Sequence, residues 1–188
     1  MITTEVRFSY ANVFEPKLTP SDDLKYSVSI LIPKEDKAGI AEIHEAIQEA
    51  VNKGLEKNTF SKMHVKGLRL PLRDGDEEFD AGKRGKEYQG FFFLNASSKN
   101  QPGLVDAALK PIIDTDVFYS GCWGRADINF FPYNQAGNRG VGVGLNNLMK
   151  SKDDDRLDGR QKAEDAFGDF KDNAPDDDDT QPGEGTLT

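Results

Sequence analysis

Two aromatic-rich segments, residues 88–99 and 117–133, constrain the fold of this chain most strongly. Read with the two-residue period of a β-strand, residues 117–133 divide into two faces. One is an ordinary core face, with Phe118, Cys122, Ala126, Ile128 and Phe130. The other mixes flat rings with polar groups and a guanidinium, and its members are Tyr119, Trp123, Arg125, Asp127, Asn129, Phe131 and Tyr133. Rings beside a cation on an open sheet face are what stacking of unpaired nucleobases requires.

The first aromatic segment also alternates, and it predicts a strand over residues 88–97. Phe91 and Phe93 share one side of this strand, and Tyr88, Phe92 and Leu94 share the other. Both sides are apolar, so alternation leaves open which of them faces the core.

The remaining elements are predicted from the same periodicities. Alternating residues predict a first strand that starts at Ile2 and ends near Pro16, and further strands over 24–32, 68–72 and 141–145, the last with a bare glycine face. Residues 40–55 have apolar positions at helical spacing, with Asp36 as the expected N-cap and Gly54 near the end. Residues 74–86 have three glycines and little apolar content, so we expect a mobile loop there.

Short strands, one intervening helix and glycine-marked bends are typical of a small β-barrel with an inserted helix. We therefore predict a mainly β fold: an OB-fold-like, five-stranded antiparallel barrel with an inserted amphipathic helix. The oligonucleotide-binding (OB) barrel is the member of this class that also accounts for the aromatic face.

The acidic residues are concentrated at the C-terminal end. Residues 151–188 hold 5 Lys+Arg and 13 Asp+Glu, a net charge of −8. Residues 1–150 hold 19 Lys+Arg and 20 Asp+Glu, a net charge of −1. Most of the total net charge of −9 therefore belongs to residues 151–188. We predict a domain over 1–150 and an acidic, largely disordered tail over 151–188. The nearly neutral domain can then carry a local basic groove.

The candidate binding residues are rings and cations near the aromatic segments. The cations expected to contact phosphates are Arg69, Arg73, Lys83, Arg84, Lys86 and Lys99, together with Arg125 on the aromatic face. The rings expected to stack on bases are Phe91, Phe93, Tyr119, Trp123, Phe131 and Tyr133. The alternative is that these rings fill the barrel core, since aromatic residues are common there.

The residues that usually carry catalysis form no recognisable set. His44, His64 and Cys122 have no metal-ligand spacing, and neither a phosphate-binding loop nor a nucleophile elbow is present. We therefore expect no enzyme activity and no metal or cofactor. One enzymatic alternative is a metal-dependent nuclease that would use acidic residues of the 74–86 loop with Lys83 or Lys86.

Three longer motifs occur in order: GFFFLNASSKNQPG at 90–103, YSGCWGRADINFFPYN at 119–134 and GNRGVGVGLNN at 137–147. With the AEDAFGDF segment at 163–170, they resemble the single-stranded DNA-binding proteins of tailed phages, a family once catalogued as a domain of unknown function. The resemblance covers about residues 2–170. It implies an OB barrel, no catalytic activity and an acidic C-terminal tail.

These observations favour a sequence-tolerant binder that protects single-stranded DNA in phage replication or recombination. We expect the tail to compete with DNA or to recruit replication or recombination proteins. The second hypothesis is an acidic protein-interaction module, either a DNA mimic or a replisome adaptor. The single cysteine and the absence of a signal peptide or an apolar run of roughly 20 residues predict a cytoplasmic, membrane-free protein, in the host cell if phage-encoded. Whether the chain forms a homodimer is left open.

Overall fold

The computed structural model describes residues 1–20, 22–157 and 159. The chain has two compact units, Met1–Asp158 and Gly159–Thr188. The predicted disordered tail falls, from residue 160 onward, outside the described residues. Within the described part of the chain, no helix is long and apolar enough to cross a membrane.

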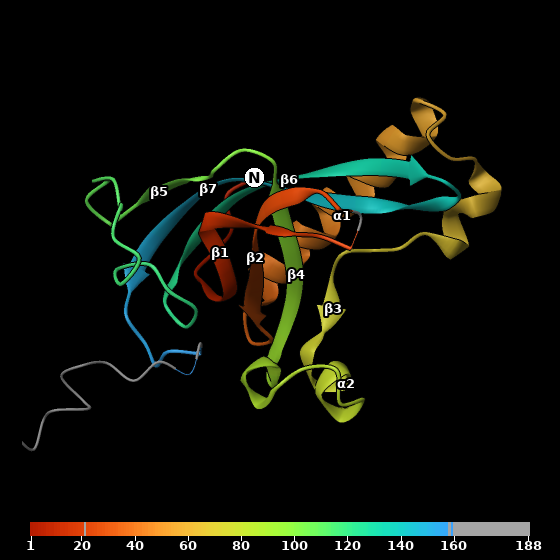
Figure 1. Ribbon diagram of the computed structural model, residues 1–188. Helices are drawn as coiled ribbons and strands as arrows, with labels where there is room; N and C mark the ends of the chain where they lie inside the picture. The colour runs from red at the N-terminus through yellow and green to blue at the C-terminus, as the bar shows by residue number, and fades with distance from the viewer. Residues whose placement is uncertain (21, 158, 160–188) are drawn as a thin grey trace, which may run out of the picture. The chain divides into compact units, whose positions relative to one another are not determined.

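The first unit is built on one seven-stranded sheet with the order β3-β4-β2-β1-β6-β7-β5 (Figure 1). Its long strands are β1 (Val6–Leu18), β2 (Leu24–Pro33), β4 (Phe91–Ser98), β6 (Trp123–Gln135) and β7 (Asn138–Lys152). A parallel bridge between Ser97 and Gly144 joins β4 to β7, which brings the two ends of this five-strand set together. The predicted mainly β, OB-type fold is thus confirmed, with seven strands in the sheet where five were predicted and a single bridge where the barrel closes.

Two short strands extend the barrel at its edges. They are β3 (Arg73–Asp74), paired with β4, and β5 (Gly103–Val105), paired with β7. Neither was predicted at these positions, because strands of two or three residues carry too little alternation to be read from the sequence.

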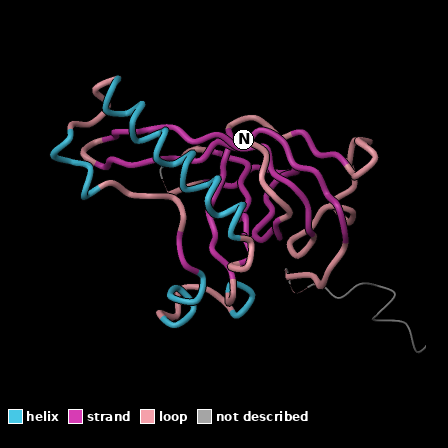
Figure 2. The backbone as a smooth tube through the Cα atoms, turned by 180° about the vertical axis from the view of Figure 1, so that it is seen from behind, coloured by secondary structure: helices cyan, strands magenta, loops and turns pink. Residues whose placement is uncertain are grey.

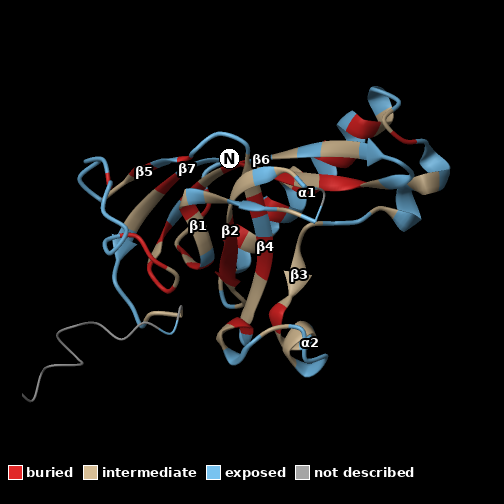
Figure 3. Ribbon diagram, viewed as in Figure 1, coloured by how far each residue is buried: buried red, intermediate tan, exposed pale blue. Residues whose placement is uncertain are grey.

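The inserted helix α1 (Lys37–Glu56) lies between β2 and β4 in the sequence and runs along β6 and β7 (Figure 2). Its N-cap is Asp36, as predicted, and the Asp36 carboxylate accepts a hydrogen bond of 3.0 Å from the Gly39 amide. Ile43, Ile47 and Val51 are buried against the barrel, so the helical stripe was assigned to the correct face. Figure 3 shows that the buried residues are concentrated on the strands of the barrel.

The main core shows which face of each aromatic segment points into the barrel. In β4, Leu94 and Ala96 are fully buried inside the barrel, which places Phe91 and Phe93 on the outer face. In β6, Ala126 and Ile128 are fully buried, as predicted for the core face. The inner faces of β1, β2 and β7 complete this core.

Three predicted elements are corrected by the structure. Regular strand structure starts at Trp123 and not at residue 117, because residues 115–121 are largely turns and bends. Residues 68–72 form no strand beyond a single bridge from Arg69 to Gly140, and the 3₁₀ helix η1 (Lys62–Gly67) precedes them. The expected mobile loop is ordered into α2 (Gly75–Asp80) and the 3₁₀ helix η2 (Lys86–Tyr88).

Local contacts explain why residues 74–88 are ordered. The Asp74 carboxylate caps α2 by accepting from the amides of Asp76 and Glu77, and it also pairs with Lys34 at 2.7 Å. Tyr88 then packs edge-on against Phe93 at 4.8 Å between ring centroids, and both rings are fully buried. This small second core lies on the outer face of the barrel and fixes the segment there.

The domain boundary predicted at residue 150 falls inside β7. This strand ends at Lys152, and the compact unit extends to Asp158. Asp153 accepts a hydrogen bond from the Tyr119 hydroxyl at 2.6 Å, and Asp154 accepts one from the Trp123 indole at 2.7 Å. The first acidic residues of the expected tail therefore belong to the domain.

Candidate nucleic-acid interface

Polar side chains occupy the outer face of the barrel where β2 and β4 pair. Ser29 lies opposite Asn95, and Ser27 lies opposite Ser97. The Ser29 hydroxyl donates a hydrogen bond of 2.6 Å to Asn95 Oδ1. These residues alternate with the buried core residues of the same strands, so the pleat that fills the core also places a polar strip on the outer face, where Asn95 is exposed and Ser29 is buried.

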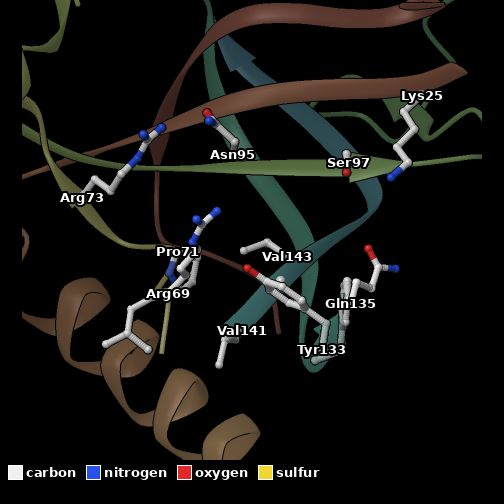
Figure 4. A pocket seen from close by; sticks show the side chains of 13 residues that line it. Lys25, Arg69, Pro71, Arg73, Asn95, Ser97, Tyr133, Gln135, Val141 and Val143 are labelled. Atoms are coloured by element: carbon white, nitrogen blue, oxygen red, sulfur yellow. The ribbon is translucent and has the colours of Figure 1, made fainter. Parts of the chain in front are cut away.

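A groove of about 720 Å³ runs beside this strip, between β4 and the β6–β7 hairpin (Figure 4). One wall carries the rings of Phe131 and Tyr133, and the other carries Asn95 and Ser97. Three cationic side chains stand around it, namely Lys25, Arg69 and Arg73. Flat rings, hydrogen-bonding groups and cations thus face one open space, which is the combination that single-stranded nucleic acid requires.

The glycines of β7 provide the surface on which the two rings lie. Phe131 pairs with Gly142 and Tyr133 pairs with Gly140 across the hairpin. A Cβ atom added to Gly142 would lie 2.6 Å from Phe131 Cζ, so the ring occupies the space above bare backbone. The ring of Phe131 is 43% exposed, which leaves part of it open to a ligand.

Backbone pairing fixes Arg69 next to this surface. Its amide donates to the Arg139 carbonyl at 2.9 Å, and its carbonyl accepts from the Val141 amide at 3.0 Å. The close approach requires a glycine, because a Cβ at Gly140 would lie 2.2 Å from the Arg69 carbonyl oxygen. The bare glycine face predicted from the sequence therefore has two roles. It lets the Arg69 backbone approach β7, and it accommodates the rings of Phe131 and Tyr133.

Arg73 and Arg84 are held more tightly than Arg69. Both form ion pairs with Glu78, at 3.1 and 3.6 Å. Their guanidinium groups lie over the Phe93 ring, at 4.4 and 5.3 Å from its centroid. Arg73 lines the groove, and Arg84 lines a smaller depression beside it.

Phe93 and Tyr119 were expected to stack on bases, and the structure buries both. Phe93 is fully covered by Tyr88 and the two arginines, and Tyr119 is 4% exposed. Tyr119 precedes the start of β6, so the alternation used to assign its face does not extend to it. Burial, together with the hydrogen bond to Asp153, raises the pKa of Tyr119 to about 12. Neither ring is open for stacking in this structure.

Trp123 and Arg125 lie at the start of β6, and neither of them lines the groove. Phe131 and Tyr133, which do line it, lie toward the end of the strand. The Trp123 indole donates to Asp154, and Lys152 Nζ lies 4.8 Å from the centroid of the ring. Arg125 is exposed and donates to the Thr3 carbonyl at 3.1 Å. One predicted face of β6 is thus divided between two places on the barrel.

The remaining predicted residues are outside the groove. Phe91 is half-buried and lies 6.2 Å from Trp123 between ring centroids. Lys83 is exposed on the segment between α2 and η2, and Lys86 is exposed at the start of η2. Lys99 is exposed after β4 and pairs with Asp23 at 3.9 Å.

The sequence analysis missed Tyr10, Lys25, Asn95 and Ser97 as candidates. For Asn95 and Ser97 a signal was present, because both alternate with the core residues of β4 and are polar. Lys25 alternates in the same way on β2. Tyr10 gave no such signal, since its place depends on an irregularity in β1 between Ser9 and Asn12.

Three acidic residues of the nuclease hypothesis, Asp74, Asp76 and Glu78, are engaged in local ion pairs. Lys34 binds Asp74 and Asp76, each at 2.7 Å, and Glu78 binds two arginines. In the described part of the chain, no group of three His, Cys, Asp or Glu side chains is arranged to hold a metal ion.

The barrel and its groove define this protein as one of the OB-fold class. Comparison with known proteins gives the family: residues 1–180 match the family model described as Enterobacter phage Enc34, ssDNA-binding protein. The chain belongs to this family.

A relative supports the assignment, and three solved structures share the fold. Protein p50 of Acyrthosiphon pisum secondary endosymbiont phage 1 is 32% identical over 162 residues, which cover 82% of this chain and 84% of p50. The structure of the Enc34 single-stranded DNA-binding protein in complex with ssDNA has a TM-score of 0.70 at 21% identity, covering 83% of this chain and 88% of that chain. A C-terminal truncation of the Enc34 protein has a TM-score of 0.68 at 22% identity, covering 83% and 87%. The gp2.5 single-stranded DNA-binding protein of bacteriophage T7 has a TM-score of 0.57 at 16% identity, covering 86% and 97%.

Proposed function

We propose that this protein is a non-enzymatic, sequence-tolerant single-stranded DNA-binding protein of phage replication or recombination, acting in the cytoplasm of the host cell. The observation that carries the proposal is the groove in which Phe131 and Tyr133 face Asn95 and Ser97 with cations around them. The family to which the chain belongs supports it.

The binding mode follows from the chemistry of the groove. Bases stack on the exposed part of Phe131 and on Tyr133, a contact worth about 1–3 kcal/mol per base. Arg69 and Lys25 contact phosphates and release counterions, which makes the affinity fall as salt rises. Stacking on these rings tolerates many sequences, because every base has a flat π-face.

The test is a salt series with labelled oligothymidine and with double-stranded DNA of the same length, half of the samples containing magnesium. We expect fluorescence anisotropy to give tighter binding to the single strand, with an affinity that falls as salt rises. Salt-independent binding, or no binding, would contradict the proposal. Magnesium-dependent cleavage would instead support a nuclease.

The acidic module remains the second candidate function, and the acidic residues beyond the domain favour it. Residues 159–188 hold 3 Lys+Arg and 9 Asp+Glu, which suits attachment to a basic partner among replication or recombination proteins. Capture of such a partner by a protein that does not shift single-stranded DNA would favour this reading.

Sedimentation of the free protein tests whether the chain forms a homodimer.

A further inference from the structure

The smaller depression next to the groove has the components of a separate binding site. It measures about 250 Å³ and is lined by Tyr10, Ser27, Val28, Ser29, Arg84 and Asn95. The Tyr10 ring is 55% exposed, and the Arg84 guanidinium lies 5.7 Å from its centroid. An exposed ring beside a cation repeats, in a second place, the chemistry of the groove.

The backbone of Tyr10 is strained in a way that presents this ring. Its φ is +46°, a left-handed conformation that residues with a Cβ rarely adopt. The strain coincides with the irregularity in the pairing of β1 and β2 between Ser9 and Asn12. Bulges of this kind redirect a side chain, and strained residues of this kind gather at ligand sites.

Asn95 connects the depression to the groove, because it lines both. Its Oδ1 already accepts from Ser29, which leaves the Nδ2 hydrogens to donate to another partner. A base carbonyl oxygen is an acceptor of that kind. A strand lying in the groove can therefore continue past Asn95 without leaving the barrel surface.

We propose that Tyr10 and Arg84 form a second nucleobase subsite, which takes a base of the same DNA strand after it has passed Asn95. The inference rests on the proposed function and extends it. The base stacks on Tyr10, with the Arg84 guanidinium beside the ring. Tyr88 supports this subsite from below, with its ring centroid 6.5 Å from that of Tyr10.

The experiment measures the affinity of the full chain for oligothymidines from about 4 to about 16 nucleotides, the range of site sizes for one OB fold. We expect Tyr10→Ala to weaken binding of the longer strands by roughly 5- to 100-fold, as for loss of one base stack. Binding of the shortest strands, which fill only the groove, should be unchanged. Phe131→Ala should weaken binding at every length.

Two further variants distinguish the effect of losing the Tyr10 ring from the effect of backbone strain at this position. Tyr10→Phe keeps a stacking ring and should bind every length as the unmodified protein does. Tyr10→Gly removes the ring but accepts a positive φ without strain, so it should fold even if Tyr10→Ala does not, and it should show the same length-dependent loss.

An unchanged affinity of Tyr10→Ala and Tyr10→Gly at all lengths overturns the second subsite, as does an equal loss at all lengths. In both cases a loss caused by Phe131→Ala leaves the proposed function standing. Failure of the unmodified protein to bind any oligothymidine instead removes the proposed function itself.

Discussion

At the scale of single residues, the arginines of this protein differ in what they can still bind. Arg73 and Arg84 are paired with Glu78 and lie over the Phe93 ring, so part of their charge is already compensated. Arg69 is exposed, and no ion pair involves it within the described residues. Arg69 is therefore the arginine of the groove best able to contact a phosphate.

Changing Arg69→Ala should lower the affinity for single-stranded DNA and reduce the slope of log K against log salt by about 0.7, the value for one phosphate contact on a single strand. Arg69→Lys should largely restore both. The matched control is Arg125→Ala, an exposed arginine on β6 outside the groove, which should leave the slope unchanged. Equal effects of the two alanine variants would contradict the assignment of the groove.

At the scale of elements, the β6–β7 hairpin works as a platform because one strand supplies rings and the other supplies bare backbone. Phe131 lies over Gly142 and Tyr133 lies over Gly140. The same absence of side chains admits the Arg69 backbone.

Gly142→Ala should displace the Phe131 ring, since its Cβ would lie 2.6 Å from Phe131 Cζ. We expect single-stranded DNA affinity to fall by several-fold while the protein stays folded, because the far end of an exposed ring can move. Gly67→Ala is the control, as nothing lies within 4 Å of a Cβ at that position. Isothermal titration with oligothymidine and thermal unfolding distinguish a binding defect from a folding defect.

The α2 segment is attached through Asp74, and this attachment depends on pH. Burial alone would raise the pKa of Asp74, but the hydrogen bond from Lys34 and those from two backbone amides outweigh it and lower the pKa below 3.8. Lys34 also lowers the pKa of Asp76. Because both carboxyl groups bind protons more weakly in the folded state, their contribution to stability is complete above about pH 5 and is lost as the pH falls through the lowered folded-state pKa values.

Asp74→Asn should cost up to about 1 kcal/mol of unfolding free energy at pH 7, because the amide still caps α2 but no longer pairs with Lys34. The difference from the unmodified protein should shrink as the pH falls through the lowered pKa of Asp74, because the protonated carboxyl no longer pairs with Lys34 as an ion. Urea unfolding between pH 3 and 7 measures this, with the exposed Asp80→Asn as control. A difference that stays constant over this range would argue against the Lys34 pair.

At the scale of the whole molecule, charge is divided between a nearly neutral domain and acidic residues that follow it. The structure moves the end of the domain from residue 150 to residue 158, because Lys152, Asp153 and Asp154 contact Trp123 and Tyr119. This boundary decides how the tail should be removed.

A chain ending at residue 158 should keep the melting temperature of the full chain and bind single-stranded DNA more tightly, since 9 acidic residues that compete with phosphates are gone. A chain ending at residue 150 should instead melt several degrees lower, because it loses the end of β7 and several hydrogen bonds of about 1 kcal/mol each, including those of Asp153 and Asp154. Calorimetry and anisotropy on the two truncations test both statements. An unchanged affinity of the longer truncation would mean that the tail does not compete.

The sequence by itself determined the fold class, the inserted helix with its Asp36 cap, and the core face of β6, whereas the core face of β4 was left open by two apolar sides and decided by the packed barrel. The features determined by the sequence follow from local periodicity, which records at each position whether a side chain faces the core. Only the tertiary structure decided which exposed rings meet. Phe93 is covered because a segment expected to be mobile folds over it, and Trp123 and Phe131 separate because β6 is long and other elements surround its two ends. Such contacts depend on residues far apart in the chain, and no local pattern encodes them.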